Sequence, residues 1–277
     1  PMAETERDEI VQLMVGRALA AEGRRTTGSV GEERLSVADL TSAGTFDSVS
    51  FSVREGEIVC MAGLVGSGRS EIAQAVFGIE GYDSGTVRVD GEAVEVKDPI
   101  QMVSLGVAYV PEDRDAQGLV TSFSITDNVA LPLLRALSHL GLRSRGRERA
   151  ISEQYADEMA IKAPTVDTPT SSLSGGNRQK TLLAKWLATK PRVLILDEPT
   201  HGIDDGSQAE VHAIIRDLAA QCMAIHMISS DLPEVLLLSD RILVIADGRL
   251  VAELPGAEAT QEVVMSAAAS NAKERSA

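Results

Sequence analysis

Two adjacent carboxylates, Asp197 and Glu198, stand between an aliphatic run at 193–196 and Pro199. Four aliphatic residues in a row predict a buried strand of a parallel sheet, and open α/β sheets place their ligands at the carboxyl ends of such strands. An aspartate there can hold Mg²⁺, directly or through water, and a neighbouring glutamate can polarise an attacking water. The pair indicates phosphate chemistry, although the octapeptide by itself also fits a plain strand and turn.

A glycine-rich loop at 63–70 is a candidate phosphate site. It follows the apolar run 58–62 and precedes a predicted helix that ends near Gly78. In this arrangement backbone N–H groups converge on phosphate oxygens at a helix N-terminus, and Ser70 is placed to coordinate Mg²⁺. The phosphate-loop pattern has a lysine where this chain has Arg69, and a planar fork does not replace a compact ammonium group. We predict phosphate binding, and efficient hydrolysis stays open.

The remaining patterns predict an α/β fold with a parallel sheet core. Short apolar or alternating runs predict the strands, and Asp-Gly pairs at 90–91 and 247–248 predict hairpin turns. The middle of the chain, roughly 122–190, reads as helical, and a Ser-Gly-Gly turn at 174–176 caps one of its helices. The opening reads as a helix at 4–20 with a linker at 21–34. The predicted strands are 35–40, 46–53, 58–62, 86–90, 93–96, 106–110, 193–196, 224–228, 241–246 and a last one reaching 254.

Composition limits the class of protein. The chain has 277 residues, is 44% hydrophobic but 3% aromatic, and carries a net charge of −15. The core is therefore aliphatic, and the acidic balance argues against nucleic acid as the main partner. We find no transmembrane helix or signal peptide, so a membrane role is peripheral. Cys60 and Cys222 lie in apolar surroundings and are expected to be buried, reduced thiols in strands. The opening Pro1-Met2 suggests a fragment of a longer chain.

Arginines alternate along 143–149, at positions 143, 145, 147 and 149. Such a run is typical of a patch that meets lipid headgroups or a partner, and equally of a solvated helix start. The shortness of the run favours the solvated helix.

Taken together, these motifs resemble the nucleotide-binding domain of ABC transporters. The order matches: the loop 63–70, Leu-Ser-Gly-Gly-Asn at 173–177, and the strand with two acids at 193–200, followed by His-Gly-Ile-Asp at 201–204 and Ile-Ser-Ser-Asp at 228–231. The likeness covers roughly 34–255. It implies a P-loop NTPase-type parallel sheet with an antiparallel β subdomain and an inserted helical subdomain at about 115–190.

A narrower resemblance is to the second half of the double-domain ATPases of bacterial monosaccharide importers of the ribose, galactose and xylose type. It rests on the segments 63–71, 111–114 with 118–120, and 229–235. Residues 14–17 are similar to the end of the first half, and 261–265 to the end of the second. The resemblance implies that 1–33 is a remnant of a preceding half, 34–255 the ATPase domain and 256–277 a polar, Ala-rich tail.

The family resemblance assigns a role to each matching residue. ATP and Mg²⁺ are the implied cofactors, with Glu198 and Ser230 as catalytic residues. Ser70, Glu112 and Asp197 are the implied metal-site residues. The implied nucleotide-binding residues are Gly63, Leu64, Val65, Gly66, Ser67, Gly68, Arg69, Ser70, Glu71, Leu173, Ser174, Gly175, Gly176, Asn177 and Asp204.

Three positions depart from the family pattern. Arg69 replaces the loop lysine, Glu112 stands where a glutamine normally links the metal to the membrane subunit, and Ser230 stands where a histidine normally contacts the γ-phosphate. A serine hydroxyl is shorter than a histidine and carries no positive charge. We therefore expect an ATP hydrolase with low activity in the isolated chain, whose own loop site binds nucleotide but turns over poorly.

The implied partners are an N-terminal ATPase half or a second copy, membrane permease subunits and, indirectly, a periplasmic sugar-binding protein. Nucleic acid is not among them, and the implied location is the cytoplasmic face of the cell membrane. A permease surface is expected around 112–131, where apolar residues either form a groove or pack the subdomain: Leu119, Val120, Phe123, Ile125 and Leu131. Phe46 is read as core rather than as a platform for adenine.

Several alternatives stay open at this point. The chain is also consistent with a regulatory half that binds nucleotide without significant hydrolysis, with an importer for a related solute such as a nucleoside, and with a self-sufficient homodimeric ATPase. A soluble relative acting in DNA repair or translation fits less well, because the chain has neither a basic arm nor a coiled-coil insertion.

Overall fold

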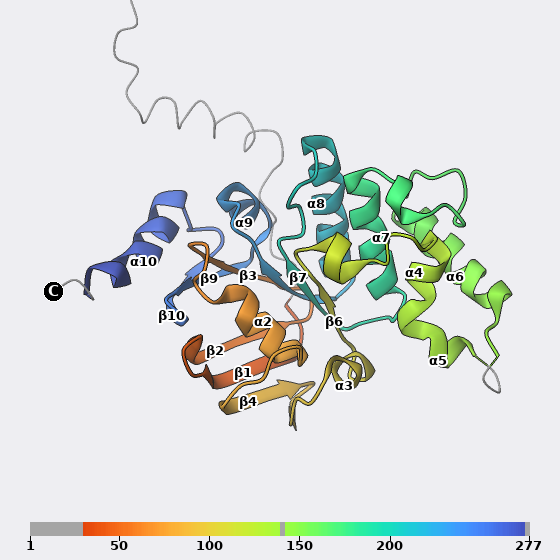
Figure 1. Ribbon diagram of the computed structural model, residues 1–277. Helices are drawn as coiled ribbons and strands as arrows, with labels where there is room; N and C mark the ends of the chain where they lie inside the picture. The colour runs from red at the N-terminus through yellow and green to blue at the C-terminus, as the bar shows by residue number, and fades with distance from the viewer. Residues whose placement is uncertain (1–29, 139–141, 275–277) are drawn as a thin grey trace, which may run out of the picture.

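The aliphatic runs of the sequence form the centre of a parallel sheet. The computed structural model describes residues 30–138 and 142–274, and Figure 1 shows this sheet between layers of helices. The helix expected at 4–20 and most of the linker expected at 21–34 lie outside the described residues. The six strands, in the order β10-β9-β3-β8-β7-β6, are β3 (Ile58–Gly63), β6 (Val107–Val110), β7 (Val193–Asp197), β8 (Ala224–Ile228), β9 (Arg241–Ala246) and β10 (Arg249–Pro255).

Every strand of this sheet except β10 pairs in parallel, and β10 forms the antiparallel edge. All residues of β6, β7 and β8 are buried. Strands covered on both faces read as continuous apolar runs, which is why the sequence pattern located them. Their carboxyl ends meet along one edge of the sheet.

A second, antiparallel sheet has the order β2-β1-β4-β5. Its turn at Asp90-Gly91 has φ of 51° and 80°, the double positive φ of a type I′ hairpin that the Asp-Gly pair predicted. Its strands are β1 (Glu33–Ser42), β2 (Phe46–Arg54), β4 (Ser84–Val89) and β5 (Glu92–Val94).

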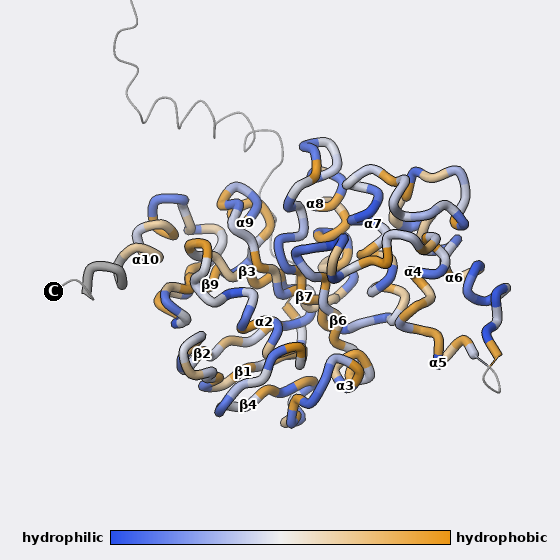
Figure 2. Tube along the Cα trace, viewed as in Figure 1, coloured by the Kyte–Doolittle hydropathy of each residue, from blue (hydrophilic) through white to orange (hydrophobic). Residues whose placement is uncertain are grey.

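Helix α2 (Arg69–Phe77) lies between the two sheets (Figure 1). Its apolar residues, among them Ile72 and Val76, join one buried cluster with strands of both sheets. The helix ends at Gly78, whose φ of 83° allows the left-handed C-cap. Figure 2 shows apolar residues, in orange, along the strands of the parallel sheet.

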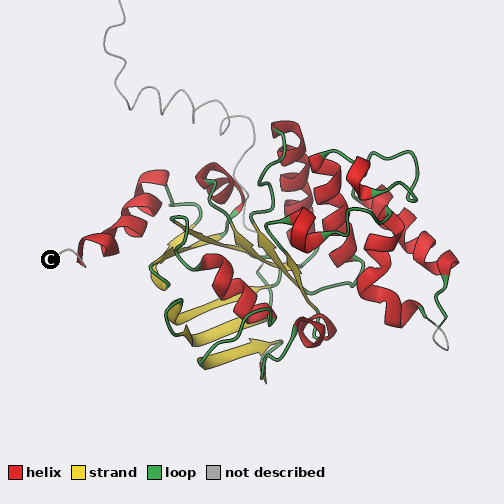
Figure 3. Ribbon diagram, viewed as in Figure 1, coloured by secondary structure: helices red, strands yellow, loops and turns green. Residues whose placement is uncertain are grey.

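Helix α3 (Pro99–Ser104) packs on the same side as α2, where its Met102 joins the same buried cluster, and the other face of the parallel sheet and one flank carry the remaining helices (Figure 3). A second buried cluster joins this face to the helices that cover it. None of the helices in the described ranges has both the length and the apolar character needed to span a lipid bilayer. The helices are α3 (Pro99–Ser104), α4 (Ile125–Ala130), α5 (Leu134–Leu137), α6 (Arg145–Glu158), α7 (Gly175–Leu187), α8 (Asp205–Ala220), α9 (Leu232–Leu238) and α10 (Gln261–Glu274).

Two sequence expectations differ from the structure. Cys60 is buried in β3, where burial raises the pKa of its thiol, but Cys222 is exposed in the turn before β8 with a φ of 67°. The segment read as a polar tail forms helix α10, and its residues Val264 and Ala268 are buried.

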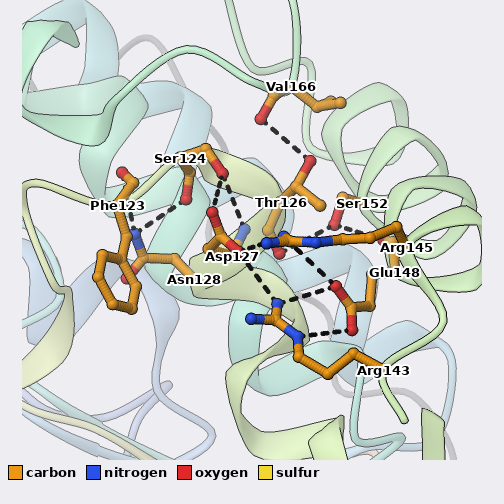
Figure 4. A network of polar contacts seen from close by, with 10 residues as sticks. All are labelled: Phe123, Ser124, Thr126, Asp127, Asn128, Arg143, Arg145, Glu148, Ser152 and Val166. Carbon is orange, nitrogen blue, oxygen red and sulfur yellow. Dashed lines mark hydrogen bonds and ion pairs between the residues drawn. The ribbon is translucent and has the colours of Figure 1, made fainter. Parts of the chain in front are cut away.

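Arg143 and Arg145 of the arginine run belong to a network of hydrogen bonds and ion pairs at the start of α6 (Figure 4). Arg143 donates from Nε and Nη2 to the buried carboxylate of Glu148 at 3.0 and 2.8 Å. Arg145 donates to Asp127 of α4 at 2.8 Å, and Arg149 pairs with two exposed carboxylates. These pairs hold the segment before α6 against α4, which favours a structural role over a lipid-binding patch.

Truncating the core of β7 tests the importance of the parallel sheet. Leu196→Ala removes a fully buried side chain and is expected to lower the free energy of unfolding by about 2–5 kcal/mol. The control Ile100→Ala, at a residue 66% exposed, should change it by less than about 0.5 kcal/mol. Urea denaturation followed by circular dichroism measures both, and equal effects would contradict the assignment of β7 to the core.

Candidate functional site

The glycine loop connects β3 to α2 in a conformation that its glycines allow. A Cβ at Gly63 would lie 2.2 Å from the carbonyl oxygen of Ile245, so no side chain fits there. Gly66 and Gly68 have φ of 79° and 97°, in the left-handed region that favours glycine. The loop therefore approaches the end of β9 closely and turns its backbone into the N-terminus of α2.

A cavity of about 450 Å³ lies over this loop. Its walls come from the loop and from the segments that follow β6, β7 and β8, so residues far apart in the sequence meet at the carboxyl edge of the sheet. It is lined by Val65, Gly66, Ser67, Gly68, Arg69, Ser70, Glu71, Gln74, Glu112, Glu198, His201 and Ser230. Most loop residues singled out in the sequence line it, together with Glu112, Glu198 and Ser230.

Asp197 ends β7 and is buried beside this cavity. Its Oδ1 accepts a hydrogen bond from Ser70 Oγ at 3.0 Å, and its Oδ2 accepts one from the Tyr109 hydroxyl at 2.8 Å. Burial raises the pKa of Asp197 to about 6, against the opposing effect of these two hydrogen bonds. The Asp197 carboxylate and the Ser70 hydroxyl are therefore close enough for both to contact one bound cation.

Glu198 follows with a φ of 45°, which aims its side chain toward the loop after β8. Its Oε2 accepts hydrogen bonds from both the backbone N–H and the hydroxyl of Ser230, each at 3.0 Å. A left-handed conformation at a glutamate is uncommon and often occurs at functional sites. Ser230 therefore holds the carboxylate at the wall of the cavity.

Arg69 is 6% exposed, and its guanidinium is engaged by the protein. Its Nη1 donates to the carbonyl oxygen of Ser229 at 2.6 Å, and its Nη2 lies 3.7 Å from Glu198 Oε1. A buried cation needs such partners. The cation at the phosphate-loop position thus bonds to the loop after β8 and approaches the candidate base.

Glu112 is exposed at the rim of the cavity, where its Oε1 lies 3.8 Å from His201 Nδ1. Both side chains line the cavity. The rim therefore pairs the segment after β6 with the segment after β7.

The Leu-Ser-Gly-Gly-Asn segment lies elsewhere. Ser174 Oγ caps α7 by accepting the N–H of Asn177 at 3.4 Å, and Asp204 caps α8 by accepting the N–H of Ser207 at 3.0 Å. The two helix starts are adjacent, because a Cβ at Gly176 would lie 2.2 Å from Ser207 Oγ. Neither Asp204 nor the segment 173–177 lines the cavity. We call the two starts, residues 173–177 and 201–204, the second face.

The cavity fits a nucleotide phosphate and Mg²⁺. Ser67 Oγ is buried without a hydrogen-bond partner among the described residues, and the first N–H groups of α2 have no partner within the helix. A helix start of this kind suits an anion. The described residues contain no group of three or more His, Cys, Asp or Glu that could hold a metal. Ser70 and Asp197 are the two residues that could contact a Mg²⁺ ion beside phosphate oxygens.

A second hollow of about 450 Å³, lined by polar groups that include Asp47 and Arg249, shares Gly66 with the cavity. Phe46 borders it but is only 4% exposed, so the ring belongs to the core as the sequence indicated. The hollow therefore extends the cavity toward the β1–β2 turn without an exposed ring from Phe46.

Sequence reasoning missed Tyr109 and Gln74, and it named His201 only as part of the motif at 201–204. Tyr109 lies in the strand next to the one that ends in Asp197, and its position in the run 106–110 was a usable signal. Gln74 follows Ser70 by one helical turn and faces the same cavity. His201 directly follows the strand-end motif, but its pairing with Glu112 depends on the order of the strands, which sequence patterns do not give.

The raised pKa of Asp197 predicts a specific pH dependence of stability. When a carboxyl has a higher pKa in the folded state than in the unfolded chain, the folded protein loses stability as the pH rises. Here the loss occurs as the pH rises from the pKa of Asp197 in the unfolded chain to its folded-state pKa of about 6. The free energy of unfolding of Asp197→Asn, measured relative to that of the wild type, should therefore be about 2 kcal/mol higher at pH 8 than at pH 4.5. Urea denaturation at the two pH values measures this, with the exposed Asp205→Asn as control. A constant difference between mutant and wild type would contradict it.

Comparison with known proteins gives the family. The sequence pattern described as "ABC transporter" matches residues 46–201. The ribose import ATP-binding protein RbsA 2 of Streptomyces avermitilis is 50% identical over 272 residues, which are 98% of this chain and 54% of that protein. The ribose import ATP-binding protein RbsA of Geobacillus kaustophilus is 46% identical over 265 residues, 96% of this chain and 54% of that protein. The chain thus spans about half the length of the curated relatives it matches.

Solved structures agree in fold. A nucleotide-free ATP-binding cassette from an ABC transporter has a TM-score of 0.72 at 22% identity, over 85% of this chain and 96% of that one. The dimeric post-hydrolysis state of a cassette bound to ADP and Pi has a TM-score of 0.69 at 20% identity, over 80% of this chain and 98% of that one. With the glycine loop, the strand-end acids and the Leu-Ser-Gly-Gly-Asn helix start in place, the chain belongs to the ABC transporter family of ATP-binding domains.

Proposed function

We propose that this chain is the ATP-binding half of an importer that couples MgATP binding and hydrolysis to transport of a monosaccharide. The observation that carries the proposal is the cavity in which the glycine loop meets Glu198 and Ser230, with Asp197 bonded to Ser70 beside it. The relatives in Streptomyces avermitilis and Geobacillus kaustophilus, both described as ribose import ATP-binding proteins, support the sugar class.

In the proposed site the loop backbone and the start of α2 would bind the phosphates, and Ser70 and Asp197, with Glu112 nearby, would hold Mg²⁺. The cation supplies charge stabilisation to the phosphates. Glu198 is the proposed base for an attacking water, and Ser230 holds it through two hydrogen bonds. The hollow beside Gly66 is the proposed binding place of the adenine ring and ribose of ATP.

This site is proposed to turn over slowly. The Arg69 guanidinium donates to Ser229 and approaches Glu198, so the cation is engaged away from the γ-phosphate and beside the carboxylate that must accept a proton. Ser230 adds no positive charge toward the phosphate, and Glu112 places a carboxylate at the metal side of the cavity.

The second face is proposed to complete another site. The start of α7 offers Ser174 Oγ and the N–H groups of Gly175 and Gly176 to an anion, outside this chain's own cavity. A second domain, the N-terminal half of the same protein or another copy, would place its nucleotide there in a head-to-tail pair. The site built from that domain's loop and this second face is the proposed active one.

Membrane permease subunits are proposed to bind this pair of domains at the cytoplasmic face of the membrane and to respond to its opening and closing. A periplasmic sugar-binding protein is the proposed indirect partner. The surface expected for them is narrower than the sequence suggested: Val120 and Phe123 are exposed, whereas Leu119 and Ile125 are buried. Leu131 is half-buried. We retain Val120 and Phe123 as the proposed contact.

A second candidate function is a regulatory half that binds nucleotide with little hydrolysis. The contact of Arg69 with Ser229, close to Glu198, is the observation that favours it. It differs from the first proposal only in the turnover of this chain's own site.

Nucleotide binding by the purified chain tests the proposed site. ATP is expected to bind, and removal of Mg²⁺ should weaken binding by about tenfold, because Ser70 and Asp197 would hold the cation and its charge would stabilise the bound phosphates. Ser70→Ala should lose most of this Mg²⁺ dependence, whereas the exposed Ser84→Ala should keep it. Isothermal titration calorimetry with and without Mg²⁺ measures both. Absence of ATP binding at millimolar concentration would contradict the proposal.

A further inference from the structure

One short turn connects the cavity with the second face. It is a single π-helical turn, Arg114–Gly118, that follows β6 and begins two residues after Glu112, which lines the cavity. Asp113 Oδ1 caps it by accepting the N–H groups of Asp115 and Ala116 at 3.0 and 2.9 Å. The turn is therefore a fixed structure rather than a loose connection between the sheet and the helices.

Arg114 bonds this turn to the second face. Its Nη1 donates to the carbonyl oxygen of His201 at 2.6 Å, and its Nη2 to that of Gly202 at 2.9 Å. The guanidinium fits between the two parts of the second face, because a Cβ at Gly202 or Gly175 would lie 3.4 or 3.6 Å from Nη2. Two donors in one rigid fork fix two consecutive carbonyls, which a single ammonium group does not do.

The far side of the turn is attached to α7. Asp115 pairs with Arg178 at 3.3 Å, and the carbonyl oxygen of Gly118 accepts a hydrogen bond from the buried Lys185 Nζ at 2.7 Å. Between them Leu182 packs so closely that a Cβ at Gly118 would lie 2.7 Å from its side chain. Arg178, Leu182 and Lys185 share one face of the helix. The turn thus holds the helix that begins with Ser174–Gly176.

His201 connects these contacts of Arg114 to the cavity. Its side chain lines the cavity and lies 3.8 Å from Glu112, while its carbonyl oxygen is held by Arg114. A shift of Glu112 or His201 when nucleotide enters would therefore act on the loop 201–204 and, through the turn, on α7. A turn needed only for local stability requires no contact with both parts of the second face.

We propose that Arg114 is a positioning residue that couples this chain's own nucleotide cavity to the second face. Arg114 keeps the loop 201–204 and the helix start 174–176 in one arrangement, and nucleotide in the cavity changes the second face through it. The assignment of the second face to a partner's nucleotide rests on the proposed function. The link between cavity and second face within this chain does not.

Hydrogen exchange with mass spectrometry on the whole chain tests the proposal. Without nucleotide, the amides of His201 and Ile203, which donate to Glu198 and Thr200, should exchange about tenfold faster in Arg114→Ala, and by an intermediate factor in Arg114→Lys. Arg149→Ala is the matched control, because it also removes an arginine bonded to two groups. Thermal melting of each variant separates a local change from unfolding.

The second arm adds MgATP at saturating concentration. In the wild type and in Arg149→Ala, nucleotide should change the exchange of a peptide covering 173–181, and Arg114→Ala should lose at least about half of that change. Unchanged exchange at 201–204 in both Arg114 variants would overturn the positioning role. A wild type that binds MgATP without any response at 173–181, or a full response in Arg114→Ala, would overturn the coupling. If the wild type binds no MgATP, the proposed function fails, while the nucleotide-free arm still decides the role of Arg114.

Discussion

The buried guanidinium of Arg69 must find partners, and this requirement shapes the cavity. A charge that is 6% exposed is tolerated only when hydrogen bonds and opposite charge replace water. The carbonyl oxygen of Ser229 supplies the hydrogen bond, and Glu198 supplies the opposite charge at 3.7 Å. One side chain from the glycine loop thereby fixes the loops after β7 and β8 relative to each other. The placement of the candidate base follows from this contact.

The loops after β7 and β8 are also held on the side that faces the core. The buried carboxylate of Glu234, in α9, accepts hydrogen bonds from the hydroxyls of Thr200 and Ser229 at 2.9 and 2.6 Å and contacts His212 Nε2 at 2.9 Å. Removing one member would leave a buried polar group unsatisfied, which costs about 1–3 kcal/mol. The loops that carry Glu198 and Ser230 are therefore positioned by two sets of bonds, one facing the cavity and one facing the core.

Sequence patterns located most of the sheet and of the cavity because both depend on local signals. Continuous aliphatic runs mark strands covered on both faces, and a glycine loop before a helix marks an anion site. Cys222 was misread because its apolar neighbours resemble a strand, whereas the chain needs a left-handed turn between α8 and β8. The helix α10 was missed although Val264 and Ala268 are four residues apart, a spacing that brings both to one face. The contacts of Arg69 and Arg114 depend on strand order and loop paths, which local patterns do not contain.

Steady-state MgATP hydrolysis by the purified chain, beside a Glu198→Gln variant, tests the central claim most directly. With Arg69 engaged by Ser229 and close to Glu198, turnover of the wild type should stay below about 0.1 s⁻¹, under the range of about 1 s⁻¹ and above that is typical of enzymes. Glu198→Gln should then change little, because a wild type that turns over this slowly has little activity to lose. Rapid turnover that Glu198→Gln abolishes would contradict the account, since Arg69, Glu112 and Ser230 would then support efficient catalysis.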